Sequence, residues 1–113
     1  MSILLDSPVD ALRQYVSFSS VSADQNFAEG VTGAREFACS RLKELGFEVD
    51  LISTPIHPII LATRGDPSWP KLVIYGHYDV QPPDPLDLWT TDPFDPVERE
   101  GRLYGRGAAD NKG

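Results

Sequence analysis

The sequence predicts an α/β protein in which two N-terminal helices precede a mixed β-sheet. Apolar residues recur at helical spacing at Val9, Leu12 and Val16, whereas apolar and acidic residues alternate over 47–51 as in a half-buried strand. A third stretch, 72–75, is apolar at every position and indicates a strand buried on both faces. The 113 residues amount to one domain at most, and a complete domain of this length would bury about two-thirds of its unfolded surface.

The two helices are predicted from their start and stop signals. Ser7 is expected to be the N-cap of a first helix over about 8–18, because a proline follows at the first helical position. Asn26, with Glu29 three residues later, has the pattern of a capping box that opens a second helix. Gly46 stands where a glycine typically ends such a helix. The apolar stripe of this second helix consists of Ala34, Phe37, Ala38, Leu42 and Leu45.

Three strands are expected after the helices, at 47–51, 58–63 and 71–75. The links between them, at 53–58 and 64–70, are short. Such links permit an antiparallel hairpin or a meander but leave no room for a crossover helix.

A proline-rich segment and a hairpin complete the predicted elements. Five prolines fall within 82–96, and a loop of this length inside a compact domain is usually functional or disordered. Trp89 and Phe94 favour the ordered interpretation, because disordered linkers are poor in aromatic residues. Residues 97–104 then form the pattern of a tight hairpin with Gly101 in its turn.

Composition excludes several classes of partner. The formal net charge of -7, from 17 acidic and 10 basic residues, argues against nucleic acid and anionic membranes, which favour a basic surface. Cys39 is the single cysteine, so we expect no internal disulfide, a reducing compartment and a packing role for its side chain. The first residues show neither the basic segment nor the long apolar segment of a secretory signal or a membrane span. The expected location is therefore the cytoplasm.

Candidate site residues follow the apolar stretch. His77 and Asp79 would project to the same side of the chain, about 6.6 Å apart, because side chains alternate along a strand. A carboxylate in that position can orient the imidazole of a metal-bound histidine. Asp110 comes after the small residues Gly105, Gly107, Ala108 and Ala109. Together with His77 it offers the nitrogen and oxygen ligands that suit zinc or manganese. The spacing alone favours a simpler interpretation, a histidine at a strand end and an aspartate that caps a following helix.

Other titratable residues are predicted to have no site role. His57 lies between two prolines and is expected to be a loop histidine. Glu98 and Glu100 fall on the solvated face of the predicted hairpin. The remaining glutamates of the helices and the first strand are expected at the surface, namely Glu29, Glu36, Glu44 and Glu48.

Three motifs together resemble a known family. GHYDVQPP at 76–83, W-x-x-x-P-F at 89–94 and G-x-LYGRGAADNKG at 101–113 are similar in order and spacing to the di-zinc metallopeptidase family of carnosinases, cytosolic dipeptidases, aminoacylases and succinyl-diaminopimelate desuccinylases. The resemblance implies that residues 1–113 are the N-terminal part of a di-zinc aminopeptidase-like catalytic domain. The remainder of that domain and its inserted dimerisation domain would then lie outside these residues.

The resemblance also implies roles for individual residues. His77 would bind one metal ion, Asp79 would be the catalytic aspartate, and Asp110 would bridge two divalent ions. These ions are expected to be zinc, and manganese or cobalt would suit the same ligands. The parent protein, a homodimer, would hydrolyse a peptide or amide bond in dipeptides or small N-acyl amino acids. Because the general-base glutamate would lie outside the sequence, the chain alone is expected to be inactive. The alternative to a piece of a hydrolase is a non-catalytic short form that acts as a binding or assembly module.

Overall fold

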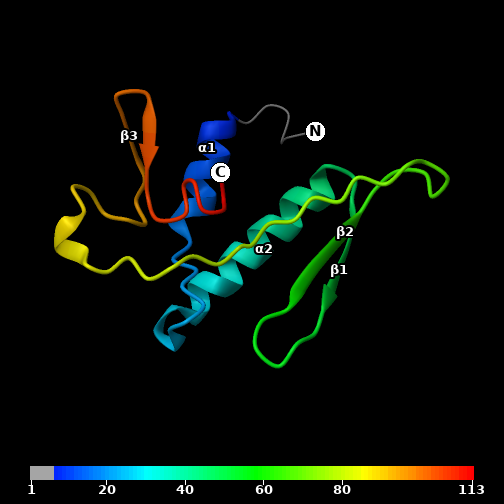
Figure 1. Ribbon diagram of the computed structural model, residues 1–113, viewed down its shortest axis with the longest axis horizontal. Coiled ribbons are helices and arrows are strands. Elements are labelled where there is room, and N and C mark those ends of the chain that lie inside the picture. The colour runs from blue at the N-terminus through cyan, green and yellow to red at the C-terminus, as the bar shows by residue number, and fades with distance from the viewer. Residues whose placement is uncertain (1–6) are drawn as a thin grey trace.

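The computed structural model describes residues 7–113, in which two helices precede the strands as expected (Figure 1). The elements are α1 (Pro8–Ser17), the short 3-10 helix η2 (Gln25–Phe27), α2 (Ala28–Glu44), β1 (Glu48–Ile52), β2 (Ile59–Thr63), the short 3-10 helix η3 (Leu86–Leu88), β3 (Val97–Arg99) and β4 (Arg102–Tyr104). Within the described residues, no helix has the length and apolar character needed to cross a membrane.

The helix boundaries follow local chemistry, with one correction. Helix α1 begins at Pro8, directly after Ser7, as predicted. The capping box expected at Asn26 and Glu29 is wrong. Asp24 instead accepts a hydrogen bond from the backbone N–H of Asn26 at 2.9 Å and opens η2, which leads into α2. Aspartate competes well for this position because its short carboxylate reaches the N–H two residues later. Gly46, at a φ of 83°, follows the end of α2 as predicted.

Two antiparallel hairpins flank the helices (Figure 1). Strands β1 and β2 pair from Glu48 with Thr63 to Ile52 with Ile59, which is the hairpin among the two arrangements that the short link permits. Strands β3 and β4 form the second hairpin, whose turn contains Gly101 at a φ of 74° as expected. In Figure 1 the β1–β2 hairpin lies beside α2, and the β3–β4 hairpin lies toward the opposite end of the molecule.

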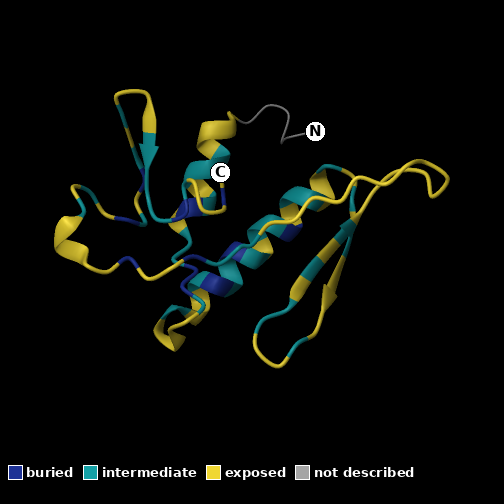
Figure 2. Cartoon of the chain, viewed as in Figure 1, coloured by how far each residue is buried: buried dark blue, intermediate teal, exposed yellow. Residues whose placement is uncertain are grey.

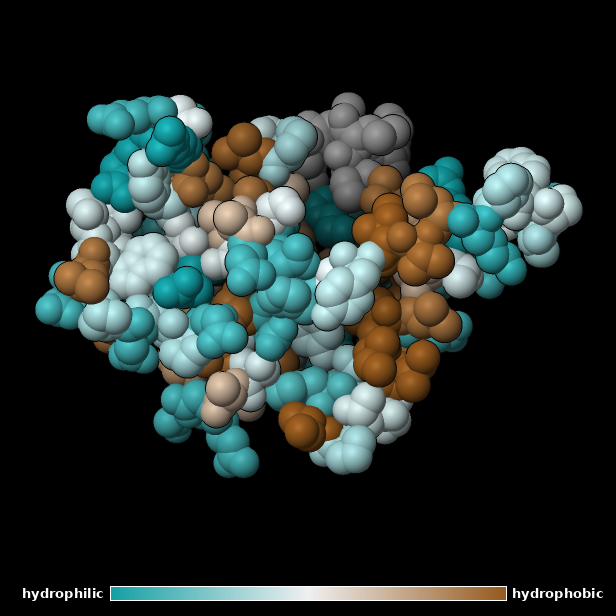
Figure 3. All heavy atoms as spheres, viewed as in Figure 1, coloured by the Kyte–Doolittle hydropathy of each residue, from teal (hydrophilic) through white to brown (hydrophobic). Residues whose placement is uncertain are grey.

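The core strand predicted at 71–75 is wrong for the described chain. Leu72, Val73, Ile74 and Tyr75 are 86–87% exposed, and no strand among residues 7–113 pairs with them. The segment instead crosses the molecule as an extended, exposed trace (Figure 2), over which apolar side chains gather (Figure 3). Nor do the described strands form one mixed sheet, because both sheets are antiparallel and two-stranded. The apolar run indicates a capacity for burial, but burial needs neighbours that the run itself does not supply.

The core lies where the two helices meet two loop segments (Figure 2). Its buried apolar side chains are Val16, Val21, Val31, Ala34, Cys39 and Val80. Cys39 therefore has the packing role expected of it. Val21 and Val80 form an isolated parallel bridge, so the chain after α1 lies directly beside the chain that follows the His-x-Asp triplet. Ser20 is fully buried at the same place.

The proline-rich segment is ordered, as its aromatic residues indicated. The indole N–H of Trp89 donates a hydrogen bond to the carbonyl of Pro83 at 2.8 Å. The ring of Phe94 packs 6.1 Å from the ring of Phe27, between centroids. The hydrogen bond closes the segment on itself, and the ring contact joins it to the start of α2.

Candidate metal centre

His77 and Asp79 lie against each other, as their spacing predicted. The Oδ1 atom of Asp79 is 3.1 Å from Nδ1 of His77, and the backbone carbonyl oxygen of Asp79 is 3.0 Å from the same nitrogen. Both neighbours of Nδ1 are acceptors, so the proton of the imidazole is favoured on Nδ1. The lone pair of Nε2 is then available to a cation, which is the arrangement typical of metal-bound histidines.

Asp110 approaches the other side of the same ring. Its Oδ1 atom is 3.0 Å from Nε2 of His77, across 33 sequence positions. The imidazole therefore has acceptors at both nitrogens. Either an imidazolium or a cation at Nε2 satisfies such an arrangement, because a neutral ring has one N–H to donate. The helix that Asp110 would cap in the simpler interpretation is absent from the described residues.

The charge on the ring follows from these neighbours. The hydrogen bond from His77 to the backbone carbonyl of Asp79 raises the pKa of His77, and the hydrogen bond to Asp110 acts in the same direction. The oxygens around the ring therefore favour a positive charge on it, whether a proton or a bound cation supplies that charge. A divalent cation and a proton compete for the same position.

Asn111 fixes the main chain of His77. Its Oδ1 atom accepts a hydrogen bond from the backbone N–H of His77 at 2.9 Å. A Cβ atom at Gly76 would lie 2.9 Å from that same oxygen, which is closer than such atoms normally approach. The glycine before His77 therefore leaves room for Asn111.

A segment that the sequence interpretation did not connect with the site also contacts it. The hydroxyl of Ser22 donates to Oδ2 of Asp79 at 2.5 Å, and the hydroxyl of Ser20 donates to the carbonyl of Tyr78 at 2.7 Å. In the sequence these serines signal only the end of a helix. A run of small hydroxyl residues after a helix is compatible with many loops, so no local signal distinguishes this role.

Lys112 is a second residue that the sequence interpretation missed. Its side chain is buried, and its Nζ atom donates hydrogen bonds to the carbonyls of Tyr15 and Phe18, each at 2.9 Å. Burial lowers the pKa of Lys112 to about 8. The two bonds attach the turn that contains Asp110 to the C-terminal end of α1.

The site contains two converging candidate ligands and no more among the described residues. Residues 7–113 hold no cluster of three or more His, Cys, Asp or Glu side chains that could hold a metal ion. The ring of His57 is 3.5 Å from the carbonyl of Ser22 and lies in a loop, as expected. Glu98 and Glu100 are exposed, and Glu98 lies 3.5 Å from Arg13.

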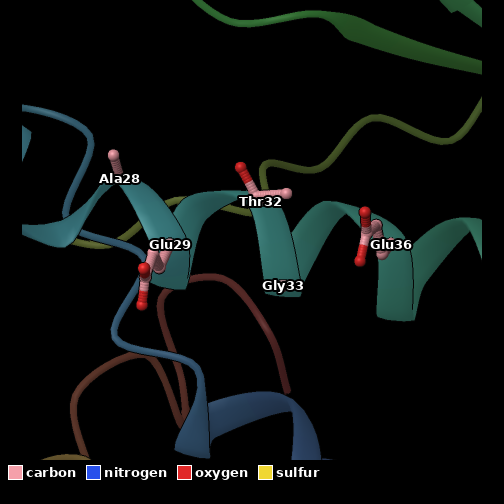
Figure 4. A pocket seen from close by; sticks show the side chains of 5 residues that line it. All are labelled: Ala28, Glu29, Thr32, Gly33 and Glu36. Carbon is pink, nitrogen blue, oxygen red and sulfur yellow. The ribbon is translucent and has the colours of Figure 1, made fainter.

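Two surface hollows lie apart from these residues. One, of about 320 Å³, follows the exposed side of α2, where Glu29, Thr32 and Glu36 project (Figure 4). The other, of about 490 Å³, lies between the proline-rich segment and Phe27. Neither is lined by the candidate ligands.

Comparison with known proteins identifies the family. Residues 73–113 match the model described as peptidase family M20/M25/M40. The chain is similar to members of this family. The matched residues include His77, Asp79 and Asp110, and the M20 peptidases are metallopeptidases that use divalent metal ions.

Relatives and solved structures extend the M20 match across the chain. The Beta-Ala-His dipeptidase of Rattus norvegicus is 38% identical over 122 residues, which cover 96% of this chain and 25% of the relative. The succinyl-diaminopimelate desuccinylase of Xylella fastidiosa is 46% identical over 81 residues, or 72% of this chain and 21% of the relative. The crystal structure of human carnosine dipeptidase 1 matches with a TM-score of 0.83 at 38% identity, over 92% of this chain and 25% of that one.

The M20 likeness confirms the α/β fold class. It also confirms the recognised family and the position of the match, the N-terminal part of the M20 catalytic domain. The chain spans about a quarter of the length of the curated relatives that it matches.

Proposed function

We propose that the whole protein to which these residues belong is a metal-dependent hydrolase of peptide or amide bonds in dipeptides or small N-acyl amino acids. The observation that carries the proposal is the approach of His77 Nε2 and Asp110 Oδ1 to 3.0 Å inside the segment that matches the family model. With Nδ1 facing the acceptors of Asp79, this approach is satisfied by a second proton on the ring or by a metal ion at Nε2. Relatives named for dipeptide hydrolysis and for desuccinylation support this class of substrate.

The donor set fits a divalent ion. Two ligand atoms at zinc distances of about 2.0–2.2 Å and tetrahedral angles lie about 3.4 Å apart, so Nε2 of His77 and Oδ1 of Asp110, now 3.0 Å apart, would separate slightly to hold an ion. We assign His77 and Asp110 as ligands, Asp110 as the bridge between two ions, and Asp79 as the catalytic aspartate that orients the imidazole. Zinc is the proposed metal, and manganese or cobalt would suit the same ligands. When bound, such ions polarise a substrate carbonyl and acidify water.

An active centre requires residues beyond these 113. A zinc site has four ligands, whereas the described residues bring two together. We therefore propose that residues 1–113 are a partial metallopeptidase catalytic domain, inactive alone, and that the parent is a cytoplasmic homodimer whose general base and remaining ligands lie elsewhere. With a net charge of -7, nucleic acid is not a proposed partner.

A non-catalytic short form that acts as a binding or assembly module is the second candidate. The absence of a third ligand near His77 in the described part of the chain favours it. The two candidates differ in whether the natural protein continues into further metal ligands and a general-base glutamate.

The test is hydrolysis by the whole protein of β-alanyl-histidine, cysteinyl-glycine and N-succinyl-diaminopimelate. We expect turnover of at least one substrate, its loss with a chelator, and its return with zinc, manganese or cobalt. His77→Ala and Asp110→Ala should abolish both turnover and stoichiometric metal binding. Glu98→Gln, at the exposed hairpin, is the matched control and should leave both unchanged. Hydrolysis that survives the chelator and the His77→Ala substitution would overturn the proposal.

A further inference from the structure

We propose that Ser22 is a positioning residue that holds the carboxylate of Asp79 against His77, an inference that rests on the proposed function. The two oxygens of Asp79 have different partners. Oδ2 accepts the hydroxyl proton of Ser22 at 2.5 Å, and Oδ1 is 3.1 Å from Nδ1 of His77. Ser22 thus sets the rotation of the carboxylate that orients the imidazole.

Ser22 is held by the buried chain that precedes it. The hydroxyl of Ser20 donates to the carbonyl of Tyr78 at 2.7 Å, and the backbone N–H of Val80 donates to the carbonyl of Ser20 at 2.9 Å. These bonds fix the main chain on both sides of Asp79. Ser20 and Val21 are fully buried and Val80 is 4% exposed, so water does not compete for the bonds. The position of Ser22 is therefore set by packed neighbours.

Helix α2 supports the same segment. A Cβ atom at Gly30 would lie 2.2 Å from the carbonyl oxygen of Ser19, so the helix contacts the segment without an intervening side chain. The segment 19–22 is consequently held between α2 and the His-x-Asp triplet, and has little freedom to move when the Ser22 side chain is altered. A substitution at Ser22 tests the hydroxyl and not the path of the chain.

The hydroxyl is needed for geometry and not for proton transfer. Without it, the carboxylate of Asp79 can rotate about its terminal bond, which is a soft torsion. Nδ1 of His77 would keep its hydrogen bond to the backbone carbonyl of Asp79, at 3.0 Å. The ring would then retain one of its two acceptors at Nδ1. Removal of an outer hydrogen bond of this kind typically lowers metal affinity or activity by about 10- to 100-fold.

The experiment compares Ser22→Ala and Ser22→Thr in the whole protein, with Ser17→Ala as the matched control. Ser17 is an exposed serine whose hydroxyl bonds a carbonyl of its own helix. In crystal structures, the carboxylate of Asp79 should turn away from His77 in Ser22→Ala and stay against it in Ser22→Thr. In the cobalt-loaded protein, the visible spectrum of Ser22→Ala should change and its cobalt affinity should fall by about 10- to 100-fold. We expect kcat to fall with KM unchanged, and the threonine variant to restore kcat.

The outcomes separate this inference from the proposed function. A Ser22→Ala protein in which Asp79 stays against His77 and cobalt binds with wild-type affinity would overturn the role of Ser22, whatever the activity. A wild-type protein without hydrolytic activity would overturn the proposed function, while the crystal structures would still decide whether Ser22 positions Asp79. Equal decreases in Ser22→Ala and Ser22→Thr would also contradict the inference, because threonine keeps the hydroxyl.

Discussion

Asn111 and His77 are joined by a hydrogen bond of 2.9 Å between the amide oxygen of the first and the backbone N–H of the second. The neighbour of Asn111, Asp110, contacts the imidazole of the same histidine at 3.0 Å. Two adjacent residues therefore fix both the main chain and the ring of His77. The turn near the end of the chain and the His-x-Asp triplet behave as one structural unit.

Removal of the Asn111 amide should weaken metal binding. Asn111→Leu deletes the acceptor, whereas Asn111→Asp keeps an oxygen in its place. In the whole protein we expect the leucine variant to bind zinc about 10- to 100-fold more weakly, and the aspartate variant to lose less. Competition with a chromophoric chelator measures both constants. Equal affinity in the leucine variant and the wild type would show that the bond to the main chain of His77 is dispensable.

Lys112 should stabilise the fold through its two carbonyl acceptors. At pH 11 the lysine is mostly neutral both in the folded chain, where its pKa is about 8, and in the unfolded chain, where the ordinary pKa is 10.5, so the cost of burying a charge hardly enters the comparison. Lys112→Met removes the donor from the carbonyls of Tyr15 and Phe18, and we expect it to lower the free energy of unfolding by about 1–3 kcal/mol. Urea denaturation at pH 11 measures the difference. The control is Lys71→Met at an exposed lysine, and a comparable decrease there would contradict the assignment.

Tyr15 should make the protein less stable at high pH. Burial raises the pKa of Tyr15 from 10.0 to about 12, with further contributions from Tyr78, Cys39 and Asp79. The unfolded chain therefore loses the phenolic proton near pH 10, while the folded chain retains it. Because the folded state then binds more protons, its stability falls as the pH rises from 10 through 12. Urea denaturation across this range should show a steeper decline for the wild type than for Tyr15→Phe. Parallel declines would mean that Tyr15 titrates normally.

The exposed stretch from Leu72 to Tyr75 should make the 113-residue chain associate. Its side chains are 86–87% exposed and its backbone has no strand partner within residues 7–113. An unpaired apolar edge favours pairing with another chain. Sedimentation of this chain should therefore show oligomers that grow with concentration, and Val73→Lys should reduce them. Leu88→Lys, at an apolar residue 78% exposed elsewhere, is the control. A chain that stays monomeric at every concentration, or a Leu88→Lys variant that reduces association equally, would contradict this prediction.

The elements that the sequence predicted well depend on neighbours along the chain. Gly46 and Gly101 adopt the positive φ expected of them, and the hairpin of β1 and β2 follows from a short link. The capping box failed because Asp24 offered a competing acceptor two residues before Asn26. These outcomes involve residues close in sequence, where the chemistry of each residue type is decisive.

The sequence did not predict the true state of 71–75 or the role of the serines at the site. Both depend on residues far away along the chain. Burial of an apolar run requires a partner strand, and the described residues provide none. The hydrogen bond between Ser22 and Asp79 spans 57 positions, and no pattern at either residue predicts it. The pairing of His77 with Asp79, in contrast, was predicted because alternation along an extended chain places them on one side.

The bond between Lys112 and Tyr15 spans 97 positions and has a consequence for the order of events during synthesis. The helices and the β1–β2 hairpin close short loops, which cost little entropy and form early. The turn around Asp110 can dock on α1 only after nearly all 113 residues have been made. Until that docking, Asp110 does not contact Nε2 of His77. A nascent chain therefore brings Asp110 to His77 only after its two helices have formed.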